Sequence, residues 1–129
     1  MKILALDYGA ARTGVAISDE TGAIARPLGI VERAATPDGL ARVCALVREH
    51  GAEHVVVGLP LTLRGERGSQ ALETEEFVNA LCALVDVPVE SYDERFTTTL
   101  AASAPGTAPE DARAAAHLLA SYLARMQSG

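Results

Sequence analysis

Residues 2–9 read Lys2-Ile3-Leu4-Ala5-Leu6-Asp7-Tyr8-Gly9, an unbroken apolar run that stops at a carboxylate followed shortly by a glycine. A short, continuous apolar run is typical of a strand that is buried on both faces, and a following turn residue ends it. We therefore expect residues 2–6 to form a buried strand in a layered fold, with Asp7 at its end.

Two more strands are expected directly after this run. Residues 13–18 and 23–31 have strand-like patterns, and only the polar turn at residues 19–22 separates them. Short connections favour antiparallel hairpins, because parallel neighbours require a crossover of about a dozen residues or more. The first third of the chain thus predicts a three-stranded antiparallel meander.

Strands and helices alternate in the rest of the chain. Strands are expected at residues 54–58 and 87–92, and the helical crossovers between strands force parallel pairing. The signals expected to begin the three helices are Thr36 with Pro37, Ser69 as an N-cap, and the capping box from Thr107 to Glu110. The sequence predicts an α/β fold whose five-stranded mixed sheet is flanked by helices, in a single domain over residues 1–129.

Composition supports one globular domain. The chain has 129 residues, of which 49% are hydrophobic and 22% charged, so it lies far from the disordered class. Aromatic residues make up only 4%, which predicts an aliphatic core. A net charge of −6 argues against a binder whose affinity comes only from neutralising phosphates, although it leaves open one that binds nucleic acid through a metal ion.

Cysteine usage and hydropathy suggest the cellular compartment. Cys44 and Cys82 each fall inside a predicted amphipathic helix, so we expect both to be reduced core residues. The N-terminal residues lack the long apolar segment of a signal peptide, and no uncharged run approaches the ~18 residues of a membrane span. We expect a cytoplasmic protein with no membrane association.

Acidic residues stand at the ends of two predicted parallel strands. Asp7 ends the first, and a carboxylate there is unfavourable unless it is solvated, paired or coordinated, although it could also simply cap the turn at Gly9. Asp93-Glu94-Arg95 ends the last, where the alternative is an exposed turn with an internal ion pair. Sites in open α/β sheets form outside the carboxyl ends of such strands.

A third acidic residue begins the last helix. Asp111 shares a helical face with Ala115, Leu118 and Tyr122, which predicts that it points inward, although an acid in the first turn also complements the helix dipole. Three such carboxylates converging at one sheet edge would suit a hard divalent cation such as Mg²⁺.

Four segments of the chain, in the same order, resemble the YqgF family. This family is also called RuvX, and its members are described as Holliday-junction-resolvase-like proteins or pre-16S rRNA nucleases. The matching segments are residues 4–16 (LALDYG through RTGVA), 57–68 (VGLP through Gly65 and Gly68), 92–98 (YDERFTT) and 111–123 (DARAA followed by Leu-Leu and Tyr-Leu). They extend over almost the whole chain.

The resemblance implies an RNase H-like fold and a metal-dependent nuclease that hydrolyses phosphodiester bonds in structured RNA or branched DNA. It implies that Asp7, Glu94 and Asp111 are catalytic and hold one or two Mg²⁺ or Mn²⁺ ions. Arginines in the motif loops could bind phosphate bidentately, or they could be ordinary solvated charges. The candidate substrate-binding residues are Tyr8, Gly9, Arg12, Arg64, Arg67 and Arg95.

One departure from the family pattern concerns the segment before Asp111. Residues 99–110 are fewer than in the family's usual segment and contain no lysine or arginine before the final acid, other members commonly having both. This difference slightly favours an alternative in which the chain is a non-catalytic nucleic-acid or ribosome-maturation module. A second alternative is a nucleotide-binding fragment like those of actin-like ATPases and sugar kinases. The sequence is compatible with a monomer or a homodimer.

Overall fold

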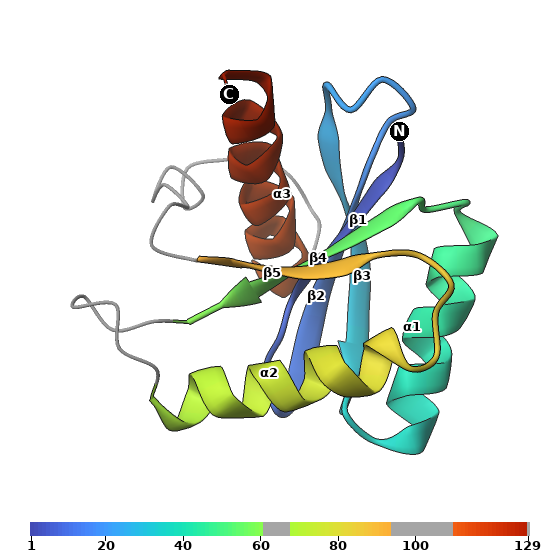
Figure 1. Cartoon of the computed structure of the whole chain (residues 1–129), viewed down its shortest axis with the longest axis vertical. Coiled ribbons are helices and arrows are strands. Elements are labelled where there is room, and N and C mark those ends of the chain that lie inside the picture. The colour runs from blue at the N-terminus through green and yellow to red at the C-terminus, as the bar shows by residue number, and fades with distance from the viewer. Residues whose placement is uncertain (61–67, 94–109, 129) are drawn as a thin grey trace.

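The computed structural model describes residues 1–60, 68–93 and 110–128 (Figure 1). Within these ranges, five strands and three helices follow one another in the predicted order. The elements are β1 (Ile3–Asp7), β2 (Arg12–Ser18), β3 (Ala25–Glu32), α1 (Pro37–Glu49), β4 (His54–Leu59), α2 (Ser69–Cys82), β5 (Val89–Asp93) and α3 (Glu110–Ser128).

One sheet has the strand order β3-β2-β1-β4-β5. The first three strands form the predicted antiparallel meander, and β1, β4 and β5 run parallel to one another. The predicted α/β fold with a five-stranded mixed sheet is therefore confirmed, and the apolar run that begins it lies at the centre.

Two strands, β3 and β5, begin two residues later than predicted. Residues 23 and 24 belong to the hairpin turn, because the Asp19 carboxylate accepts hydrogen bonds from the backbone amides of Ala23 (2.9 Å) and Ile24 (3.1 Å). The last strand starts at Val89 rather than at residue 87. Pro88 precedes it, and a proline has no amide to donate to a sheet ladder.

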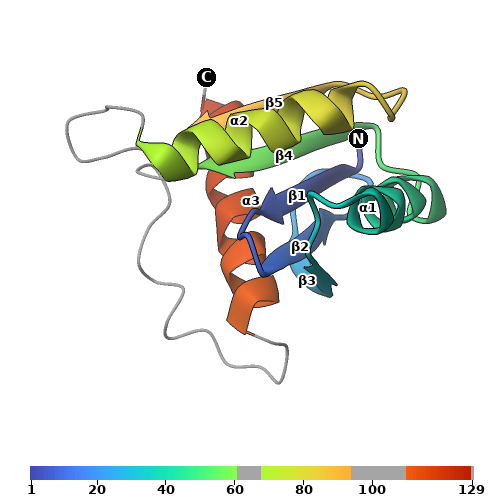
Figure 2. The same ribbon diagram turned by 90° about the horizontal axis from the view of Figure 1, so that it is seen from below.

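The two faces of the sheet bury separate cores, and Figure 2 shows the helices that cover them. Leu4 and Leu6 of β1 pack with α1 and α2. Ile3 and Ala5 point to the opposite face and pack with α3. This alternation follows from the two-residue period of a strand and explains why the run is apolar at every position.

The helix starts are partly as predicted. Thr36 caps α1 by accepting a hydrogen bond from the Gly39 amide (3.1 Å). The expected cap at Ser69 is wrong: Ser69 is the first helical residue, and the cap residue is Gly68, whose carbonyl accepts from the Leu72 amide (3.1 Å). Glycine is tolerated at this position, so no side-chain cap is needed. Thr107 lies outside the described residues.

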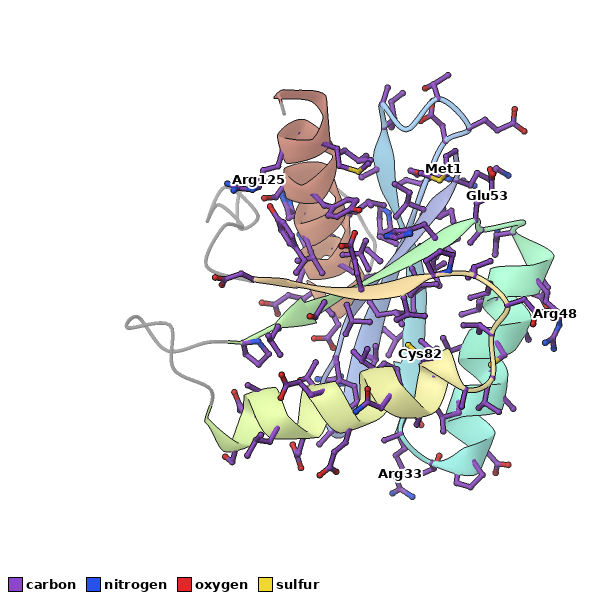
Figure 3. The ribbon with its side chains drawn as sticks, viewed as in Figure 1. Met1, Arg33, Arg48, Glu53, Cys82 and Arg125 are labelled. Atoms are coloured by element: carbon purple, nitrogen blue, oxygen red, sulfur yellow. The ribbon has the colours of Figure 1, made fainter. Side chains whose placement is uncertain are left out.

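The cysteines differ in their environment. Both are free thiols, and Cys44 is buried as predicted. Cys82 is exposed at the end of α2, which contradicts the prediction of a core position (Figure 3). Leu81 and Phe77 form the buried face of this helix, and a residue one step beyond Leu81 is turned away from it. In the described ranges, no helix combines the length and the apolarity that a membrane span requires.

Candidate active site

The carboxyl ends of the three parallel strands meet at one edge of the sheet. Leu6 of β1 is in register with Val57 of β4, and Leu59 of β4 is in register with Asp93 of β5. Asp7 is the last residue of β1, so it stands at this edge, as the sequence predicted. The opening between neighbouring strand ends is where ligands enter open α/β sheets.

Gly14 brings the last helix to the same place. It pairs with Asp7 across β1 and β2, on the α3 face of the sheet. A β-carbon on Gly14 would lie 1.8 Å from the backbone carbonyl oxygen of Asp111, so the first turn of α3 rests directly on this glycine. Since paired Cα atoms in an antiparallel ladder are about 5 Å apart, Asp7 and Asp111 occupy the same corner.

The Asp111 carboxylate lies at the border of the buried face of α3. Its side chain is 38% exposed, and Nε of Arg12 is 3.3 Å from its Oδ2. The prediction for Asp111 is therefore met only in part: Ala115, Leu118 and Tyr122 on its helical face are buried as expected, whereas the Asp111 side chain stays partly exposed. The next residue, Ala112, is fully buried, because the helix contacts β2 through the Asp111 backbone rather than through the Asp111 side chain.

The turn after β1 carries two of the candidate substrate contacts. Gly9 must be small, because a β-carbon there would lie 2.5 Å from the carbonyl oxygen of Arg12. Tyr8 turns to the other face and stacks on Phe77 of α2, with ring centroids 4.7 Å apart and planes 25° apart. Partial burial, followed by the charges of Glu73 and Glu76, raises the pKa of the Tyr8 phenol.

A pocket of about 170 Å³ adjoins Asp7 on the α2 side of the sheet edge. Tyr8 and the residues on either side of it form one wall. Pro60, directly after β4, also lines the pocket. The opposite wall comes from α2 and consists of Gln70, Glu73 and Thr74. None of these three residues was among the candidates expected from the sequence. Their spacing of three and four places them on one helical face, one turn before Phe77, and that periodicity was the available signal.

Four candidate residues cannot be placed. Glu94 and Arg95 lie outside the described residues, as do Arg64 and Arg67. Within residues 1–60, 68–93 and 110–128, no three His, Cys, Asp or Glu side chains form a group that could hold a metal ion. Asp7 and Asp111 are thus the part of the expected carboxylate triad that the structure brings together.

Structural comparison identifies the same architecture in known resolvases. A RuvC from T. thermophilus in complex with a Holliday junction substrate matches with a TM-score of 0.66 and 17% identity, covering 98% of this chain and 96% of that one. The fowlpox virus Holliday junction resolvase matches with a TM-score of 0.57 and 14% identity, covering 97% and 99%. At these identities the likeness establishes the RNase H-like fold alone.

Sequence comparison finds much closer relatives. A protein of Chloroflexus aggregans named "Putative pre-16S rRNA nuclease" is 48% identical over 99 residues, which cover 77% of this chain and 70% of the relative. A protein of the same name from Chloroflexus aurantiacus is also 48% identical, but the match spans only 65% of its length. Residues 1–125 match the family described as "RuvX: Holliday junction resolvase". The chain belongs to the RuvX Holliday junction resolvase family, as the resemblance of its motifs implied.

Proposed function

We propose that this chain is a divalent-metal-dependent nuclease that hydrolyses phosphodiester bonds in structured nucleic acid, either precursor 16S rRNA or branched DNA. The observation that supports the proposal is the contact of α3 on Gly14, because the backbone of Asp111 lies against the strand partner of Asp7, the acidic residue that ends β1. Relatives named as nucleases and resolvases support the same activity. We treat residues 1–129 as one nuclease domain.

Asp7 and Asp111 fit a hard divalent cation. Both supply carboxylate oxygens, which Mg²⁺ and Mn²⁺ prefer, and Asp111 is exposed enough to be reached from solvent. Glu94 is the proposed third ligand. Tyr92 packs on the α3 face, so strand alternation turns Asp93, the other acid of this motif, to the opposite face.

A bound Mg²⁺ or Mn²⁺ would supply a Lewis acid that lowers the pKa of a water molecule and neutralises charge on the phosphate. The chain itself has to orient the substrate. Arg12 is a cation at this corner, where its guanidinium forms an ion pair with the Asp111 carboxylate. A guanidinium can bind a phosphate through two parallel hydrogen bonds, so Arg12 is suited to hold the substrate backbone next to the two acids.

The direct test replaces Asp7 with Asn and measures cleavage of a four-way DNA junction and of precursor 16S rRNA in Mg²⁺ and in Mn²⁺. We expect Asp7→Asn to lose at least about 100-fold in rate, because an amide cannot replace a charged ligand. Asp86→Asn is the matched control, since Asp86 is exposed in the connection between α2 and β5. Circular dichroism should show that both variants are folded.

The two substrates also distinguish the chemical alternatives. Equal activity of Asp7→Asn and the parent protein would remove Asp7 from catalysis. If the parent protein cleaves neither substrate but still binds both without metal, that result would favour the non-catalytic binding module. Isothermal titration provides a second measurement, in which Asp7→Asn should weaken Mn²⁺ binding and Asp86→Asn should leave it unchanged.

A further inference from the structure

The pocket between Tyr8 and α2 is not explained by phosphodiester chemistry. It lies on the α2 side of the sheet edge, whereas Asp111 and its helix occupy the opposite side. Its lining within the described residues includes two acidic residues, Asp7 and Glu73, and neither lysine nor arginine. Such a pocket repels a phosphate and favours an uncharged group that donates hydrogen bonds.

The walls of the pocket suit a flat ring. The Tyr8 ring is held in place from behind by Phe77, which is 2% exposed, so it presents a rigid aromatic surface. Pro60 adds an apolar side to the lining. Nucleobases that leave a helix stack on aromatic side chains of this kind, and the stack adds to binding whichever base it is.

The opposite wall offers hydrogen-bond acceptors. Thr74 is almost fully buried and its hydroxyl donates to the Gln70 carbonyl oxygen (2.8 Å), which fixes this turn of α2. Glu73 lies in the same turn and lines the pocket. Its carboxylate accepts hydrogen bonds and has none to donate. Such an acceptor distinguishes the four bases, because their Watson–Crick edges carry different donors.

Guanine matches this acceptor best. It alone has two adjacent donors, N1–H and the N2 amino group, which both oxygens of one carboxylate can accept. In adenine and cytosine the amino group lies next to a ring nitrogen that accepts hydrogen bonds. In uracil and thymine the single N–H donor lies between two carbonyl oxygens. A carboxylate is repelled by each of those neighbouring acceptors.

We propose that this pocket binds an unpaired guanine next to the scissile phosphate and that Glu73 determines the preference for it. The inference rests on the proposed function, because the base reaches the pocket as part of a nucleic-acid substrate. It extends that function by giving the acidic residues of α2 a role in substrate choice. Asp7 belongs to both regions, so a base in the pocket positions its own phosphate at the acidic corner.

Binding can be measured without cleavage. Fluorescein-labelled heptathymidylates with one central G, inosine, A or C are titrated with protein in EDTA at low salt, and anisotropy gives each Kd. We expect the G probe to bind at least about tenfold more tightly than the A and C probes, since a good bidentate pair is worth about 1–3 kcal/mol. Inosine lacks the amino group and should fall between G and the others.

Two variants of the same helix complete the test. Glu73→Gln should reduce the ratio between the G and A probes to about one, because an amide offers one acceptor and one donor. Glu75→Gln removes the same charge from α2 at a position outside the pocket and should keep the parent ratio. Equal binding of all probes by the parent protein, binding too weak to measure, or an unchanged ratio in Glu73→Gln would each overturn the proposal.

The result is separable from the test of nuclease activity. Asp111→Asn changes the acidic corner outside the pocket, so this protein should retain the preference for G in EDTA even when it cleaves nothing. A preference for G in a protein without nuclease activity would reject the proposed function and keep the base pocket. Cleavage by a parent protein that binds all the probes equally would keep the proposed function and reject the base pocket.

Discussion

Replacing Gly14 with alanine tests whether α3 positions Asp111 through its contact with β2. The new β-carbon would lie 1.8 Å from the Asp111 carbonyl oxygen and 3.1 Å from the Ala112 amide nitrogen. Nonbonded carbon and oxygen atoms need a separation of about 3.3 Å. The first turn of α3 must therefore move away from the sheet by roughly 1.5 Å, because backbone atoms cannot rotate aside.

Such a displacement affects stability and activity differently. Overpacking of a well-packed contact costs about 1–3 kcal/mol of the free energy of unfolding. Moving one carboxylate by about 1 Å relative to its partner can reduce the rate about 100-fold. Urea denaturation and single-turnover cleavage measure the two effects separately. We expect the rate to fall by much more than the loss of folded protein explains.

Gly29→Ala is the matched control, because nothing lies within 4 Å of a β-carbon at that position on β3. It should change the free energy of unfolding by no more than about 0.5 kcal/mol and leave the rate unchanged. If Gly14→Ala behaved like Gly29→Ala in both assays, the contact between β2 and α3 would not hold the site together.

Two other predictions concern stability away from the site. Partial burial raises the pKa of Glu90, but hydrogen bonds from Tyr122 and His54 outweigh it and lower the pKa below 4.5. The resulting stabilisation should be present above pH 4.5 and decline as the pH falls through the folded-state pKa. Tyr122→Phe should lower the free energy of unfolding at neutral pH by at most about 1 kcal/mol, because Glu90 is half exposed, and should flatten this pH dependence in urea titrations; an unaltered pH profile would contradict the assignment. Arg33 has a left-handed backbone (φ 48°), held by its amide's hydrogen bond to the Ala11 carbonyl oxygen, and Figure 3 shows its side chain directed away from the protein. Arg33→Gly should raise the melting temperature while Arg33→Ala does not, since glycine adopts this conformation without the penalty of about 1 kcal/mol; equal melting temperatures would show that the backbone is not strained.

The order and pairing of the elements could be predicted from the sequence because they follow local rules. A short turn at residues 19–22 requires a hairpin, and a helix between strands requires a parallel crossover. Asp7 could be placed for the same reason, since a carboxylate after an unbroken apolar run has to stand at the end of the strand. The predictions that held depended on patterns within single elements and on the connections between consecutive elements.

The predictions that failed depended on how distant elements pack. Helical spacing assigned Asp111 to the buried stripe, and the rest of that stripe is buried. The Asp111 side chain stays partly exposed because the first turn of α3 meets β2 through its backbone at Gly14, where no side chain fits between them. Cys82 lies outside the core because the buried face of α2 carries Leu81, one position earlier, and turns Cys82 away from it. The Glu73 pocket was missed because the packing of Tyr8 on Phe77 joins two segments that no local pattern relates.

The seating of α3 on Gly14 has a consequence for regulation by local unfolding. Beyond its first turn, α3 is anchored to the sheet by Tyr92 and Tyr122, whose rings meet edge to face at 5.4 Å. Fraying of only the first turn would separate Asp111 from Asp7 while this distant anchor and the rest of the sheet stay intact. Under the proposed function, catalytic competence then depends on this one helical turn. Amide hydrogen exchange at Ala114 and Ala115, whose helical acceptors are the carbonyl oxygens of Glu110 and Asp111, would report how often the turn opens while the protein remains folded.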